Sequence, residues 1–257
     1  MNHKNRGIAL IFSFERLDFD PRLKIENGFA VDVEALKKSF RNLGFDVHKY
    51  SNLNYSNFEE IIDSYSQRDF TDDDCFVCAI VGHGDAVEQV NCADHKGYVI
   101  ENLFKIFGDV VSLQSKPKVF IINMCRGERL VGLGKIKSDE NVGSKMNDEW
   151  GLNPPKEKGD PTNISQDIFK FYTTIRGYFA AFSNTSGSFT LNKFCEHLDN
   201  FAAKKSLTEI FTNVQRELSN KVRIIEIDEN TYKFYTVMDQ SNTGRRKVIF
   251  YDKKKLN

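Results

Sequence analysis

The sequence predicts an α/β fold in which a sheet is covered by helices on both faces. Over the first 130 of the 257 residues, short apolar runs alternate with amphipathic stretches, as strands alternate with helices. The chain is 40% hydrophobic with 22 phenylalanines, which supplies one sizeable core. No apolar run approaches the roughly 18 residues of a membrane span. We therefore expect a soluble protein with one large or two small domains.

The first half of the chain gives four strands and three helices. Val31, Val33, Leu36 and Phe40 recur at helical spacing before Gly44, which predicts a helix over residues 30–43. Two further helices are expected at residues 57–67 and 98–107. The apolar runs predict strands at residues 7–12, 45–47, 75–81 and 118–123.

Residues 131–165 interrupt this pattern and predict a linker. Three of the five prolines (Pro154, Pro155 and Pro161) lie there among many polar residues, with little periodicity. The chain therefore divides into segments 1–130, 131–165 and 166–257. In the last segment we expect strands at residues 168–172, 177–182, 233–238 and 247–251, helices at 189–203 and 207–222, and a turn at 240–244.

Charge and cysteine content restrict the partners and the compartment. Thirty-six basic residues balance 36 acidic ones, so neither a nucleic acid nor a membrane surface is expected as a partner. The five cysteines form an odd set without disulfide spacing, and the apolar stretch near the amino terminus is too short for a signal peptide. A reducing cytoplasm fits these features, and we expect no cofactor.

His83 and Cys125 are the candidate catalytic residues, because each directly follows an apolar strand. A histidine can remove the proton of a cysteine that attacks a carbonyl. The backbone amides of Gly84 and Cys125 could then stabilise an oxyanion. Two alternatives stay open from the residues alone: both side chains could be core residues, or Cys75, Cys78 and His83 could bind zinc, although Cys75 and Cys78 should point to opposite faces of a strand.

A family resemblance supports the first interpretation. The segment Ile121-Ile122-Asn123-Met124-Cys125-Arg126-Gly127 resembles the caspase nucleophile motif, Gln-Ala-Cys-Arg-Gly, and His83 lies 42 residues upstream, near the spacing of about 50 in caspases. The resemblance covers residues 6–130 and 166–252. It implies an open, mostly parallel six-stranded sheet, with large-subunit and small-subunit segments in one chain. With no adaptor-like domain before residue 6, the chain resembles an effector-type, insect-like caspase.

The chain departs from caspases at the pocket for the substrate aspartate. Caspases are similar to one another in holding this aspartate with two arginines and the glutamine of the motif. Here Glu26 stands at the first arginine position, the segment of the second reads Phe182-Ser183-Asn184, and Asn123 replaces the glutamine. These residues predict a substrate pocket, formed by Glu26, Asn123, Phe182 and Ser183, that binds aspartate poorly.

Two functions follow from the resemblance. The first is a decoy of apoptotic signalling that pairs with an active caspase, and the alternative is an active cysteine endopeptidase for peptide or protein substrates with another primary specificity. The resemblance also implies a homodimer or heterodimer formed through the last strand, expected at residues 247–251, unless its basic neighbours keep the chain monomeric. Asp139 in the sequence Ile136-Lys137-Ser138-Asp139 is the expected processing site.

Overall fold

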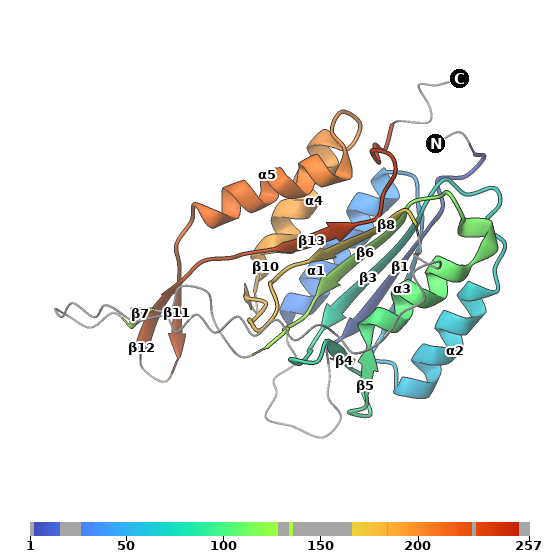
Figure 1. Cartoon of the computed structure of the whole chain (residues 1–257). Helices are drawn as coiled ribbons and strands as arrows, with labels where there is room; N and C mark the ends of the chain where they lie inside the picture. The colour runs from blue at the N-terminus through green and yellow to red at the C-terminus, as the bar shows by residue number, and fades with distance from the viewer. Residues whose placement is uncertain are drawn as a thin grey trace, which may run out of the picture.

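The predicted six-stranded α/β sheet is present. A computed structural model of the chain describes residues 3–15, 27–127, 134–135, 166–183, 185–227 and 230–251. The central sheet has the order β13-β8-β6-β3-β1-β2, and only β13 at its edge runs antiparallel to its neighbour (Figure 1). The strands are β1 (Ile8–Phe14), β2 (Asp46–Ser51), β3 (Phe76–Gly82), β6 (Lys118–Asn123), β8 (Ile168–Tyr172) and β13 (Asp239–Asn242).

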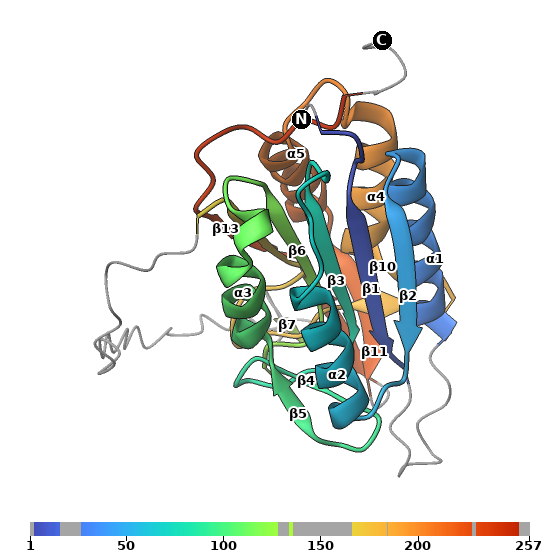
Figure 2. The ribbon, with the colours of Figure 1, turned by 90° about the vertical axis from the view of Figure 1, so that its right-hand side faces the viewer.

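Helices cover both faces of the sheet because its central strands are buried on both sides. One face carries α2 (Tyr55–Ser66) and α3 (Ile100–Asp109), with the short 3₁₀ helix η1 (Val111–Leu113) following α3. The other face carries α1 (Asn27–Asn42), α4 (Phe189–Phe201) and α5 (Leu207–Ser219). Figure 2 shows the two helical layers on either side of the sheet.

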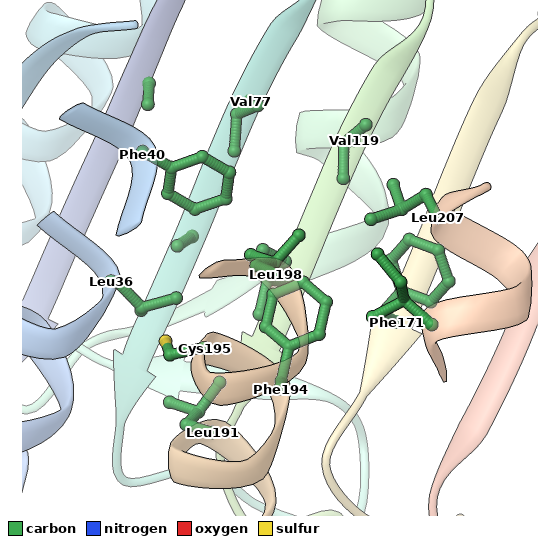
Figure 3. Close-up of a cluster of buried hydrophobic side chains, with 14 of the residues drawn as sticks. Leu36, Phe40, Val77, Val119, Phe171, Leu191, Phe194, Cys195, Leu198 and Leu207 are labelled. Carbon is green, nitrogen blue, oxygen red and sulfur yellow. The ribbon is translucent and has the colours of Figure 1, made fainter. Parts of the chain in front are cut away.

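The core under α1, α4 and α5 joins the two segments of the chain. Side chains of the strands, such as Val77 and Val119, meet Leu36 of α1 and Phe194 of α4 there (Figure 3). Phe171 of β8 stacks on Phe211 of α5 with ring centroids 3.7 Å apart. Because β8 also pairs with β6, residues before and after the expected linker share one sheet and one core.

Three small sheets lie beside the main one. They are β4 (Gln89–Asn91) with β5 (Gly97–Val99), β9 (Phe182–Ser183) with β10 (Gly187–Ser188), and β11 (Arg223–Ile227) with β12 (Asn230–Phe234) and β7 (Gly134–Lys135). The strand expected at residues 233–238 thus overlaps only with β12 and lies outside the main sheet, and β11 was not predicted. β7 follows residues 121–127, the nucleophile segment, and pairs with β12 of the last segment.

The prediction of an edge strand at residues 247–251 is wrong. Val248 and Phe250 are buried, which produces the alternation of a strand, but their backbone binds the loop between α4 and α5 instead. Phe250 N donates to Ala202 O at 2.9 Å, and Leu207 N donates to Val248 O at 2.8 Å. The edge is β13, within residues expected to form a turn, since a polar edge strand shows no alternation of burial.

The strand expected at residues 177–182 is also largely absent. Gly177 adopts φ 83° in a turn, and only Phe182 belongs to a strand, β9. The aromatic residues there suggested a strand, but the backbone of this turn hydrogen-bonds to the segment that contains Cys125. The hydrogen-bond partners of this turn are therefore set by tertiary contacts and not by its local sequence.

The two cysteines of the proposed zinc alternative lie in separate cores. Cys75 belongs to the cluster under α1, and Cys78 belongs to the cluster under α2 and α3. Opposite faces of one sheet cannot offer these two thiols to one ion. Within the described ranges, no helix is both long enough and apolar enough to cross a membrane.

Candidate active site

The carboxyl ends of two neighbouring strands, β3 and β6, bring His83 and Cys125 to the same end of the sheet. Strands β3 and β6 are parallel, and the last pair in their register is Val81 with Asn123. His83 and Cys125 each follow that pair by two residues. Since the carboxyl ends of parallel strands meet at one edge, the two predicted catalytic residues occupy equivalent positions there.

Gly84 packs directly against the nucleophile segment. A Cβ atom at Gly84 would lie 2.7 Å from Cys125 O and 2.8 Å from Met124 Sδ, so a larger residue could not approach as closely. The loop after β3 is held by Asn91 N, which donates to His83 O at 3.0 Å, and by a bridge between Gly84 and Val90. This packing fixes the backbone around the expected oxyanion site.

The surroundings of His83 favour its neutral form. Its ring is half-buried and meets the ring of Phe29 on α1 edge to face, with centroids 5.2 Å apart. Burial lowers the pKa of His83, because the charged imidazolium loses solvation. A neutral imidazole can accept a proton from a thiol, as a general base must.

Cys125 is the accessible cysteine among the five. Its side chain is partly exposed, whereas Cys75, Cys78, Cys92 and Cys195 are buried. Burial raises the pKa of all four buried thiols, to about 12 for Cys92 and Cys195. A thiol must form a thiolate to attack, so these four lack the environment of a nucleophile.

Arg126, next to the predicted nucleophile Cys125, anchors this segment to the second half of the chain. Arg126 N donates to Tyr178 O at 2.9 Å, and Gly177 N donates to Arg126 O at 2.7 Å. The guanidinium carbon lies 3.8 Å from the centroid of the Tyr172 ring, and Nη1 donates to Thr174 O at 3.1 Å. The backbone that directly follows Cys125 is therefore bound to the segment around Gly177 and Tyr178.

The same guanidinium connects the segment that contains Cys125 to the edge strand β13. Arg126 Nε donates to Glu88 Oε1 at 2.7 Å, and Nη1 donates to Asp239 Oδ2 of β13 at 2.8 Å. Glu88 also accepts two hydrogen bonds from Arg176 at 2.9 Å. Burial opposes ionisation of Glu88, but the hydrogen bonds from Arg176 and Arg126 hold its pKa below the usual value. A buried cation thus has two carboxylate partners.

Asn123 is buried, and both ends of its side-chain amide are engaged. Nδ2 donates to Asp32 Oδ2 at 3.1 Å, and Oδ1 accepts from Thr173 Oγ1 at 2.7 Å. Asn123 is 2% exposed and Asp32 is fully buried. The residue at the glutamine position of the caspase motif is therefore bound within the protein.

Two of the other expected pocket residues, Phe182 and Ser183, form the short strand β9. Ser183 Oγ accepts from the backbone amides of Thr185 and Ser186 at 3.3 Å within its own turn. Phe182 pairs with Ser188 through the backbone of β9 and β10. Glu26 and the processing residue Asp139 lie outside the described residues.

Sequence reasoning did not identify Asp32, Glu88 and Asp239 as parts of this region. Asp32 carried a signal, because it lies three residues after Phe29 and four before Leu36, on the apolar face of the predicted helix. A carboxylate on that face indicates a buried polar contact. Glu88 and Asp239 stand in polar segments without a comparable signal.

Comparisons with known proteins agree with this geometry. A family model described as a caspase domain matches residues 6–246. Caspase-6 of Gallus gallus is 30% identical over 263 residues, covering 99% of this chain and 84% of that protein. Caspase-1 of Drosophila melanogaster is 32% identical over 222 residues, covering 85% and 65%. The crystal structure of Caspase-1 from Spodoptera frugiperda is similar with a TM-score of 0.80 and 26% identity, covering 98% and 94%.

Proposed function

Because the chain belongs to the caspase family, we propose that it is a decoy of apoptotic signalling that pairs with an active caspase and does not cleave efficiently after aspartate. The observation that carries this proposal is that both ends of the Asn123 side-chain amide are hydrogen-bonded within the protein, to Asp32 and to Thr173. A bound amide is a poor ligand for a substrate carboxylate.

The size of the expected defect follows from the missing arginines. A hydrogen bond to a charged group contributes about 1.5–3 kcal/mol, so the loss of two costs about 3–6 kcal/mol. This corresponds to a discrimination of roughly 10²–10⁴-fold. Glu26 adds a like charge to any substrate aspartate that it faces. Cleavage after aspartate should therefore be very slow, even with a competent dyad.

The edge strand β13 supports pairing with a relative. It ends the order of the main sheet, and Gln240, Ser241 and Asn242 are exposed. An unpaired edge offers backbone donors and acceptors to a second strand. Asp239 of the same strand binds Arg126, so a partner at β13 would lie beside a residue that fixes the nucleophile segment.

An active cysteine endopeptidase with another primary specificity is the second candidate. The equivalent positions of His83 and Cys125 and the partial exposure of the Cys125 thiol favour it. If Glu26 faces the pocket, its carboxylate would suit a lysine or arginine of the substrate. In that case Asn123 need not contact the substrate at all.

A titration experiment separates these two functions. We expect the Cys125→Ala chain, added to an active effector caspase, to form a mixed complex and to change turnover of an aspartate substrate, because pairing needs no thiol. A variant with Ser241→Lys and Asn242→Lys should lose both effects, since charged side chains protect an edge from pairing. Sedimentation and fluorogenic turnover are the measurements. Cleavage of a peptide library by the wild type but not by Cys125→Ala, without a mixed complex, would establish the endopeptidase instead.

Processing at Asp139 should require another caspase. Because the pocket binds aspartate poorly, we expect an active effector caspase to cut the Cys125→Ala chain in trans, giving a new amino terminus at Glu140. Amino-terminal sequencing of the fragments checks this, with Asp139→Ala as the control. Cuts at Asp148, Asp160 or Asp167, or no cut, would reject Asp139 as the site. A cut made by the wild type alone would show that the chain cleaves after aspartate.

A further inference from the structure

A buried carboxylate on α1 joins three elements of the candidate site. Asp32 Oδ2 accepts from Asn123 Nδ2, and Asp32 Oδ1 accepts from Ser188 N at 2.7 Å. Asn123 is the last residue of β6, two residues before Cys125, and Ser188 is the N-cap residue of α4. Asp32 therefore connects α1, the nucleophile segment and the start of α4.

We propose that Asp32 is a positioning residue that sets the orientation of Asn123 and, through the end of β6, the reactivity of Cys125. Asp32 is fully buried, so it acts through Asn123 and not by contact with a substrate. The proposal concerns the chemistry of the thiol and does not depend on whether the chain is a decoy or an endopeptidase.

The surrounding backbone is fitted to this carboxylate. Gly187 adopts φ 75°, and a Cβ atom there would collide with Asp32 Oδ1 and lie 3.1 Å from Gly28 O. A side chain at residue 187 would thus displace the carboxylate from the Ser188 amide. The turn before α4 and the first turn of α1 therefore leave space for one arrangement of Asp32.

The hydrogen bonds require an acceptor at both oxygens of residue 32, which the ionised carboxylate supplies. Asn123 Nδ2 and Ser188 N are both donors. An asparagine at residue 32 has one oxygen and one NH₂ group, so a donor would face a donor at one of the two contacts. Unpaired buried donors are costly, and we expect Asn123 to turn away or the β6 end to shift.

Ionisation of Asp32 should follow from this burial. Desolvation raises the pKa of Asp32 to about 7, and the hydrogen bonds from Ser188 and Asn123 oppose the rise. In the described part of the chain Asp32 has no ion pair, and Cys195 of α4 is near enough for the Asp32 charge to help raise the pKa of its thiol. Because the folded-state pKa lies above the ordinary value near 3.8, the folded state binds the proton more tightly. The stability from this group is complete below pH 4 and is lost as the pH rises towards 7.

The decisive experiment compares Asp32→Asn with the exchanged pair Asp32→Asn/Asn123→Asp. At pH 8, where Asp32 is ionised, iodoacetamide labelling of Cys125 should slow by about tenfold in Asp32→Asn, because the nucleophile segment is misplaced. The exchanged pair restores complementary contacts: the amide of residue 32 donates to the carboxylate of residue 123, which still accepts from Thr173. We expect it to recover most of the rate. Glu34→Gln is the matched control, since it makes the same chemical change on the same helix at an exposed ion pair with Lys37.

Two further readouts separate positioning from a general loss of structure. The pH dependence of wild-type unfolding between pH 4 and 7 should be reduced in Asp32→Asn and kept in Glu34→Gln. In the wild type alone, the backbone amide resonance of Ser188 should titrate with an inflection near pH 7, which requires no variant to fold. A folded Asp32→Asn variant that labels at the wild-type rate would overturn the proposal, as would an exchanged pair that folds but labels no faster than Asp32→Asn.

Discussion

Iodoacetamide should label Cys125 on the order of 10³-fold faster than any buried cysteine at pH 8. Iodoacetamide reacts with the thiolate of an accessible cysteine, and Cys125 is partly exposed whereas the other four cysteines are buried. The buried thiols Cys92 and Cys195, with a pKa of about 12, are ionised only to about one part in 10⁴. Peptide mapping by mass spectrometry after timed labelling of the native protein measures the five rates.

The same experiment tests the partnership of Cys125 and His83. His83→Ala should slow labelling of Cys125, because the candidate general base is lost. His48→Ala is the matched control. His48 lies on the edge strand β2, two strands away from β3 in the sheet order, and pairs there with Asp46. Equal labelling of all five cysteines, or an equal effect of the two histidine changes, would contradict a reactive dyad.

Cleavage after aspartate should increase by roughly 10²–10⁴-fold when arginines are placed at both expected positions. Glu26→Arg removes a like charge and adds a guanidinium, and Ser183→Arg adds the second. Two charge-assisted hydrogen bonds to the substrate carboxylate account for a gain of this size. The measurement is kcat/KM for a fluorogenic peptide that ends in aspartate, with the wild type as reference.

The controls distinguish pocket chemistry from a general effect of positive charge. Glu26→Arg with Ser186→Arg carries the same charge, but its second arginine lies at an exposed turn position beyond the expected pocket. It should gain at most one of the two contacts. Robust turnover of the aspartate peptide by the unmodified protein would contradict the pocket argument. So would no gain in a Glu26→Arg/Ser183→Arg variant in which Cys125 still labels rapidly.

The central fold was predictable because its signals are local. Buried strands such as β3 and β6 are uninterrupted apolar runs, and α1 repeats Val33, Leu36 and Phe40 at the helical period. The positions of His83 and Cys125 follow from the same signals, since His83 comes directly after β3 and Cys125 lies two residues after β6. A parallel sheet then places both side chains at one edge, which is what the structure shows.

The edge of the sheet was not predictable from local pattern. β13 is polar and mostly exposed, so its sequence does not differ from a turn. Val248 and Phe250 alternate as in a strand because both enter the core, while their backbone binds Ala202 and Leu207. Apolar side chains mark the buried positions of a segment. Which backbone groups that segment hydrogen-bonds to depends on the path of the whole chain.

The sequence by itself determined the alternating strands and helices, the two catalytic candidates and the replacement of the expected pocket residues. Only the tertiary structure decided what those residues contact. Asp32 meets Asn123 across 91 residues and Ser188 across 156, and Arg126 meets Asp239 across 113. Periodicity reports the solvent exposure of each residue along its own element. Hydrogen bonds between distant polar groups form only after strands and helices have packed, because burial is what makes an unpaired donor or acceptor costly.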